Sequence, residues 1–171
     1  DREVGSSFAV YKDGKPIVDI WGGHSDSNKE SAWEKNTLAT VWSTTKGVAA
    51  ITLAYAYEKG LLDYEEKVSK YWPEFGCNGK EDITVGMLLS HQAGICGSST
   101  DEVDDYFNQE VMAKELAQMT PIWEPGTASG YHSMTYGWLT SELIIRVTGK
   151  TLGTYFKEEI GGPNEIDFHI G

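Results

Sequence analysis

The chain has 171 residues, with 14 Lys and Arg against 26 Asp and Glu, a net charge of −12 and 40% hydrophobic residues. This length suits one domain or part of a larger one, and the hydrophobic content is enough for a buried core, which excludes a disordered tail. The acidic balance repels phosphate backbones and anionic lipid headgroups. We therefore expect no nucleic-acid partner and no role at a membrane surface.

The cysteines and the apolar runs leave the cellular compartment open. Cys77 and Cys96 are too few for a disulfide framework and are not spaced as a Cys-x-x-Cys pair. No apolar run is long enough to span a membrane, and the first residues show no signal-peptide pattern. The chain begins with Asp1 rather than Met, which indicates a processed chain or a piece of a longer one. Localisation is therefore unknown from the sequence.

An antiparallel hairpin is predicted near the N-terminus, over about residues 8–21. Two β-favouring runs flank a turn that carries Asp13-Gly14, a dipeptide typical of tight hairpin turns. Two glycines end the second run, and polar residues 25–36 show no periodicity. The pattern indicates a strand pair followed by a loop.

A mostly helical region is predicted after the hairpin. Apolar residues over about 43–60 leave almost no polar face, so we expect a helix there that is buried on most sides and stops at Gly60. Residues 61–171 are interpreted as further short helices, with expected stretches near 68–73, 87–91, 101–119, 135–147 and 151–161. The chain, residues 1–171, is thus interpreted as a portion of one α+β domain.

The most informative sequence is Ser43-Thr44-Thr45-Lys46, which joins strand-like residues 39–42 to the predicted helix. Helix positions i and i+3 share a face with Cβ atoms about 5–6 Å apart, so the Ser43 hydroxyl and the Lys46 amine can meet. Serine becomes nucleophilic when a base takes its proton, and apolar surroundings favour the neutral lysine that can do so. Because Ser-x-x-Lys alone also occurs by chance at solvated helix starts, its interpretation depends on other motifs.

Three further motifs follow in order. Leu-Leu-x-His-x-x-Gly spans residues 88–94, Trp-x-Pro-Gly spans 123–126, and Tyr131 and Ser133 form a Tyr-x-Ser pattern. With Ser-x-x-Lys, this order resembles the serine β-lactamase and penicillin-binding-protein superfamily, in particular its class C-like branch that includes many esterases. The similarity covers nearly the whole chain, and the combination is far more specific than any single motif.

The resemblance implies a β-lactamase/transpeptidase-like fold and acyl transfer through an acyl-enzyme. It makes Ser43 the nucleophile, Lys46 the group that accepts its proton, and Tyr131 the group that passes this proton to the leaving group. Ser133 would hold a polar group of the substrate or Lys46, and Ser in place of the more familiar Asn favours esterase-like members over β-lactam turnover. The substrate is expected to be a small-molecule ester or amide, and no cofactor or metal is implied.

Structural interpretations of the same residues stay open. Tyr131 can be a packing residue behind a glycine, and Ser133 can cap the helix predicted to begin near Thr135. His91 is interpreted as a structural residue at a helix end rather than a base. The other histidines lack metal-ligand spacing with one another or with the cysteines: His24, His132 and His169.

Three patterns are rejected, and one motif of the family is missing. Gly-Lys-Thr at 149–151 suggests a phosphate loop, but the earlier glycine of that motif would fall at Ile144. The family's third motif lies far beyond the tyrosine, so neither Trp-Gly-Gly at 21–23 nor His-Ile-Gly at 169–171 has its position. We therefore expect this chain to be the N-terminal part of the fold. Its strands would have unpaired edges, through which association is possible.

The leading hypothesis is a serine hydrolase or transesterase that acts on esters. One alternative from the same chemistry is a β-lactamase or D-alanyl peptidase. Comparing the rates on nitrocefin and on short-chain nitrophenyl esters would distinguish this alternative from an esterase. Another is a non-catalytic scaffold or an inactive fragment of such an enzyme. We expect an enzyme, although the chain as given can be inactive without the pocket wall that the third motif supplies.

Overall fold

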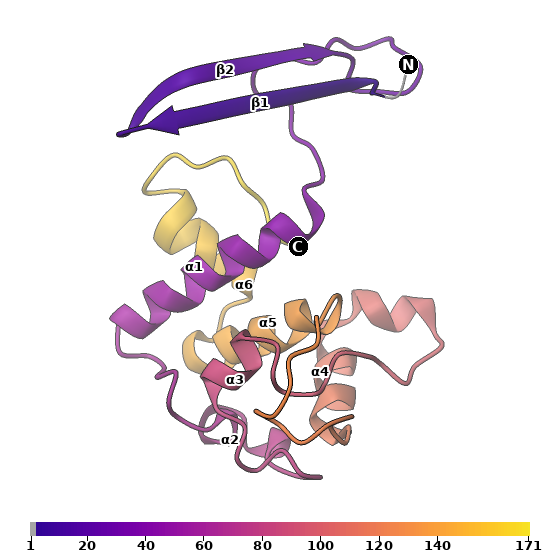
Figure 1. Cartoon of the computed structure of the whole chain (residues 1–171), viewed down its shortest axis with the longest axis vertical. Coiled ribbons are helices and arrows are strands. Elements are labelled where there is room, and N and C mark those ends of the chain that lie inside the picture. The colour runs from indigo at the N-terminus through magenta and orange to yellow at the C-terminus, as the bar shows by residue number, and fades with distance from the viewer. Residues whose placement is uncertain (1–2) are drawn as a thin grey trace. The chain divides into compact units, whose positions relative to one another are not determined.

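The computed structural model describes residues 3–171, and its contacts divide the chain into two compact units, Asp1–Val41 and Trp42–Gly171. Within the described residues, the first unit holds both strands and the second holds the helices (Figure 1). The predicted order of a hairpin followed by a mostly helical region is confirmed.

Strands β1 (Gly5–Lys12) and β2 (Lys15–Gly23) form a two-stranded antiparallel sheet. Asp13 and Gly14 connect them with φ of 51° and 73°, and positive φ at both positions is what a two-residue type I′ turn requires. The predicted dipeptide therefore makes the turn.

Residues 3–41 contain no buried residue. On one face of the hairpin Phe8 pairs with Ile20, and both side chains are 60% exposed. Backbone pairing rather than a core defines this unit. Residues 39–41, predicted as strand-like, have no regular structure, because their β-favouring side chains find no partner strand within the described chain.

Helix α1 (Thr45–Glu58) follows a single 3-10 turn, Trp42–Thr44. One side of α1 is buried: Ala49, Thr52, Leu53 and Ala56. The opposite side is exposed and carries Gly47, Ala50, Ile51 and Ala54, with Ile51 59% exposed. The prediction that this helix is buried on most sides is therefore wrong for the described chain. A helix that is apolar all round carries no sequence signal for which face packs.

The remaining helices are short except for two. Their bounds are α2 (Val68–Tyr71), α3 (Val85–Leu89), α4 (Gln109–Gln118), α5 (Thr135–Thr148) and α6 (Leu152–Phe156), with 3-10 turns at Pro73–Phe75 and Val103–Phe107 and a π turn at Lys157–Gly161. Helix α5 packs against α1, α2, α3, α4 and α6. Its fully buried residues Leu139, Leu143 and Ile144 lie in the core of the unit.

The single helix predicted over 101–119 is two elements. The acidic residues form the 3-10 turn Val103–Phe107, and α4 begins only after Asn108. The Asn108 side chain accepts hydrogen bonds from the backbone N–H groups of Glu110 (3.1 Å) and Val111 (3.2 Å). Because Asn is among the best N-cap residues, it starts a new helix where acidic residues alone would have continued one.

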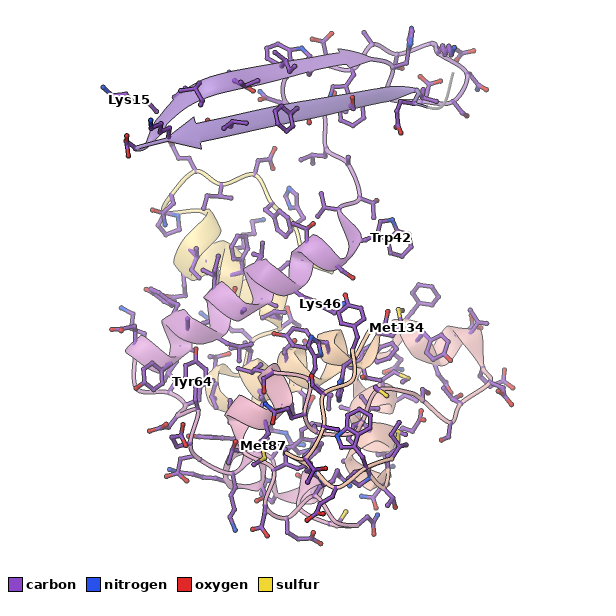
Figure 2. All side chains as sticks on the ribbon, in the orientation of Figure 1. Lys15, Trp42, Lys46, Tyr64, Met87 and Met134 are labelled. Atoms are coloured by element: carbon purple, nitrogen blue, oxygen red, sulfur yellow. The ribbon has the colours of Figure 1, made fainter. Side chains whose placement is uncertain are left out.

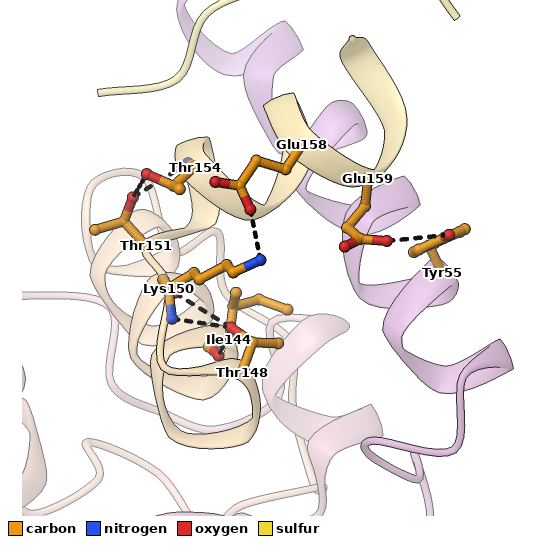
Figure 3. Close-up of polar contacts among 8 residues, drawn as sticks. All are labelled: Tyr55, Ile144, Thr148, Lys150, Thr151, Thr154, Glu158 and Glu159. Atoms are coloured by element: carbon orange, nitrogen blue, oxygen red, sulfur yellow. Dashed lines mark hydrogen bonds and ion pairs between the residues drawn. The ribbon is translucent and has the colours of Figure 1, made fainter. Parts of the chain in front are cut away.

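Residues 149–151 connect helices α5 and α6 and do not follow a strand, as a phosphate-binding loop would (Figure 3). Gly149, with φ of 73°, ends α5, and the Thr151 hydroxyl accepts from the backbone N–H of Thr154 at the start of α6. The Lys150 amine forms an ion pair with Glu158 (2.5 Å). Gly149 and Thr151 thus form helix ends and the Lys150 amine is paired with a carboxylate, which agrees with the rejection of this pattern as a phosphate site.

Candidate active site

Ser43 and Lys46 meet at the start of α1. Lys46 Nζ donates to Ser43 Oγ at 3.2 Å and to the backbone carbonyl oxygen of Ser133 at 2.7 Å. Figure 2 shows Lys46 pointing from α1 toward the segment that carries Met134. The spacing of three residues places both groups on one helix face, as expected, and the second bond ties α1 to the segment before α5.

Tyr131 completes this group. Its pKa is lowered by side-chain hydrogen bonds, first with Ser43 and then with Lys46, and by the positive charge of Lys46. Lys46 Nζ lies 4.9 Å from the centroid of the Tyr131 ring, and Tyr131 is 55% exposed. The phenol is therefore open to a ligand and lies in surroundings that favour phenolate. The structure brings together all three residues that the sequence marks as catalytic candidates.

Ser133 contributes its backbone rather than its side chain to the contacts of this group. Its carbonyl oxygen accepts from Lys46, whereas its side chain is exposed. Helix α5 has Met134 at its N-cap and no side-chain cap hydrogen bond, so the interpretation of Ser133 as the cap is wrong. Sequence analysis could not find the carbonyl, since every residue has one.

The sequence stretches 88–94 and 123–126 form the support of the Tyr131 segment. The backbone carbonyl of Gln92 accepts from Gly126 N–H (3.1 Å) and from Trp123 Nε1 (3.3 Å). The Trp123 ring covers Gly130, where a Cβ atom would lie 2.5 Å from Trp123 Cη2. Glycine before Tyr131 is therefore needed for this close approach.

Two histidine rings, the half-buried ring of His91 and the buried ring of His132, contact the same segment. His132 N–H donates to His91 Nδ1 (3.1 Å), and Ile95 N–H donates to His132 Nε2 (3.1 Å). His132 Nδ1 lies 2.7 Å from the Gly130 carbonyl oxygen and donates to it. Burial is the main cause that lowers the pKa of both His91 and His132. The structural interpretation of His91 agrees with these contacts, but its connection to the tyrosine segment had no sequence signal.

A cavity of about 370 Å³ opens beside Ser43 and Lys46. Its apolar lining comes mainly from Ala49, Met134, Tyr136, Gly137, Trp138, Leu152 and Ile170. Trp42, also in the lining, has φ of 47°, which is rare for a bulky residue and places strain next to Ser43. The arrangement combines a hydroxyl, an amine and a phenol at the edge of a space for a small ligand.

Other kinds of site find little support in the part of the chain that the structure describes. No group of three or more His, Cys, Asp or Glu side chains there could hold a metal ion. Cys77 and Cys96 are free thiols. No helix among residues 3–171 has the length and apolar character that crossing a membrane requires.

Comparison with known proteins gives consistent matches along the chain. The family model described as Beta-lactamase matches residues 1–171. The protein named Esterase/beta-lactamase LipL, from Mycobacterium tuberculosis (strain ATCC 25618 / H37Rv), is 40% identical over 171 residues, which are 99% of this chain and 40% of that protein.

Two solved structures are similar at comparable identity. A family VIII carboxylesterase is 44% identical with a TM-score of 0.89, over 95% of this chain and 45% of that chain. A penicillin-binding protein homologue from Caulobacter crescentus is 39% identical with a TM-score of 0.93, over 99% of this chain and 46% of that chain. The chain thus spans 40–46% of the length of these three relatives.

Proposed function

The chain belongs to the Beta-lactamase family and has the hairpin and helices of the β-lactamase/transpeptidase-like fold, and on this premise we propose that the protein is a serine hydrolase or transesterase acting on small esters. The observation that carries the proposal is the cluster of Ser43, Lys46 and Tyr131 beside a cavity, in which Lys46 donates to Ser43 and lies 4.9 Å from the centroid of the Tyr131 ring. The names of two relatives, an esterase/β-lactamase and a carboxylesterase, support ester substrates.

Acylation begins with attack of Ser43 Oγ on the ester carbonyl carbon. Lys46 passes its own proton to the Tyr131 phenolate and then takes the serine proton across the 3.2 Å contact, while the carbonyl electron pair moves onto oxygen. The Ser43 N–H, in the 3-10 turn that precedes α1, provides one donor to this oxyanion. The ester C–O bond then breaks, and the proton travels from Lys46 through Tyr131 to the leaving alkoxide.

Deacylation repeats these steps with a new nucleophile. Water in a hydrolase, or an alcohol in a transesterase, gives its proton to Tyr131 as its oxygen bonds to the acyl carbon. The bond from that carbon to Ser43 Oγ breaks, and the proton that Tyr131 received passes through Lys46 to Ser43 Oγ. The lowered pKa of Tyr131 supports this role, because its phenolate is then available nearer to neutral pH.

Amide substrates are the second candidate. The relative LipL carries both esterase and β-lactamase in its name. Ser133 stands where members with β-lactam activity more often have Asn, and this difference favours esters. The ratio of rates on nitrocefin and on short-chain nitrophenyl esters separates the two candidates.

The test is ester hydrolysis by the purified protein at its natural length. Ser43→Ala is expected to abolish hydrolysis of short-chain nitrophenyl esters, because it removes the nucleophile. Thr44→Ala is the matched control, since Thr44 is the next hydroxyl along the chain and its side chain makes no cap hydrogen bond. Hydrolysis retained in Ser43→Ala, or lost equally in Thr44→Ala, would contradict the proposal.

A further inference from the structure

His91 holds the backbone on both sides of Tyr131. Its carbonyl oxygen accepts from Gly130 N–H (3.1 Å), and its ring Nδ1 accepts from His132 N–H (3.1 Å). These two N–H groups belong to the residues immediately before and after Tyr131. One residue of the 88–94 stretch therefore holds the backbone N–H groups of the residues on both sides of Tyr131.

The second of these bonds requires a neutral His91 ring. A ring nitrogen accepts a hydrogen bond only when it carries no proton, so the His91 proton is on Nε2. His132 is fixed in the opposite form, because its Nε2 accepts from Ile95 and its Nδ1 donates to Gly130. The two imidazoles thus have different tautomers, each determined by backbone groups.

The surroundings of His91 are aromatic on several sides and cationic on one. Its ring centroid lies 5.2 Å from that of Tyr131, 5.4 Å from that of His132 and 5.0 Å from that of Tyr136. Burial lowers the pKa of His91, and the positive charge of Lys46 lowers it further. No carboxylate contributes to this shift, so the neutral ring is favoured.

We propose that His91 is a positioning residue for Tyr131, which in its neutral form keeps the phenol at Ser43 and Lys46 and on protonation releases it. A proton on Nδ1 would remove the acceptor for His132 N–H and add a positive charge near Lys46. The hold on Tyr131 would then be lost from one side. The catalytic consequence rests on the proposed function, whereas the tautomers and the hydrogen bond do not.

Two substitutions separate positioning from folding. His91→Asn can retain an acceptor oxygen near the place of Nδ1, does not titrate, and tolerates the left-handed φ of 63° better than most residues. His91→Ala removes the acceptor. We expect kcat of His91→Ala to fall about a hundredfold with KM changed far less, because misplacing a reacting group by about 1 Å costs that much. His91→Asn should recover most of this loss.

The pH dependence of kcat separates a positioning role of His91 from a merely structural one, because a merely structural role would not change it. In the parent protein, kcat should have an acid inflection at the pKa of His91, and His91→Asn should lack it. His169→Asn is the matched control, because the His169 side chain is 64% exposed and paired with Asp167. It should retain the inflection. An unchanged inflection in His91→Asn, or an unchanged kcat in His91→Ala, would overturn the proposal.

Imidazole ¹⁵N NMR of the substrate-free protein tests the geometry without activity. We expect His91 protonated on Nε2, His132 protonated on Nδ1, and a titration of His91 below the usual histidine range. A proton on His91 Nδ1 near neutral pH would overturn the inference whether or not the protein hydrolyses esters. If NMR gives the expected tautomers but Ser43→Ala still hydrolyses esters, the proposed function is rejected. The hydrogen-bonded geometry of His91 is retained in that case.

Discussion

The two units of the chain differ in what holds their residues in place. In the hairpin unit no described residue is buried, and Phe8 and Tyr11 are 60% and 63% exposed. In the helical unit Leu53, two turns after Lys46 on α1, is completely buried. Catalytic groups must be held within a fraction of an ångström, and only the second unit has the packed surroundings for that.

The difference also separates two kinds of apolar residue. Those of the helical core are needed to hold α1 against α5, and hence Lys46 against the Ser133 carbonyl. Those of the hairpin and the outer side of α1 remain exposed in the described chain. Association through the unpaired edges of β1 and β2 stays a prediction of the sequence.

The largest expected effect lies in the helical unit, at Lys46 and Tyr131, the pair proposed to transfer protons. Lys46→Ala should lower the rate of ester hydrolysis by several orders of magnitude, and Tyr131→Phe by about a hundredfold or more, the usual scale for a positioned acid or base. Lys15→Ala, in the hairpin, should leave the rate unchanged. Steady-state kinetics checks this, and near-normal rates in either site variant would reject the role of that residue.

Core and hairpin should differ next in stability. Leu53→Ala removes a completely buried side chain and is expected to lower the free energy of unfolding by about 2–5 kcal/mol. Phe8→Ala should change it by less than about 0.5 kcal/mol, because that ring is mostly exposed. Urea-induced unfolding measures both. Equal losses would show that the hairpin has a core contact absent from the described structure.

A buried lysine offers a smaller effect within the helical unit. Lys80 is completely buried, and its amine donates to the carbonyl oxygens of Cys77 (2.8 Å) and Met119. Lys80→Met keeps the apolar stem but leaves both carbonyls without this donor, so we expect a loss of about 1–3 kcal/mol. Exposed Lys15→Met is the control for thermal and urea unfolding. A more stable Lys80→Met protein would mean that desolvation of the amine outweighs its hydrogen bonds.

Acidification should weaken the helical unit gradually. The folded pKa of His91 and of His132 is lower than the usual histidine value of about 6.5, so between these values the unfolded state binds more protons. The stabilisation is complete above about pH 6.5 and is lost as pH falls through the folded pKa values. Unfolding free energies measured from pH 7.5 to 5 should fall less steeply for His91→Asn. Identical slopes would contradict this origin.

Local signals in the sequence predict the elements that local physics determines. Asp13-Gly14 predicts the turn because both residues accept positive φ. The contact of Ser43 with Lys46 follows from helix periodicity. These features depend on residues within one turn of each other.

Features that join distant segments have no such signal. Nothing in the sequence near Ser133 indicates that its carbonyl binds Lys46, and nothing near His91 indicates that it binds the backbone 41 residues later. The sequence also did not predict the exposed side of α1, because an apolar residue such as Ile51 is typical of a protein core. Tertiary packing decides all three.

Covalent labelling tests the central claim most directly, that Ser43 activated by Lys46 is the nucleophile. The intact mass of the natural-length protein is measured before and after a fluorophosphonate probe, and the modified peptide is sequenced. We predict one adduct on Ser43, absent from Ser43→Ala and formed far more slowly in Lys46→Ala. An adduct on another serine, or one that persists in Ser43→Ala, would contradict the account.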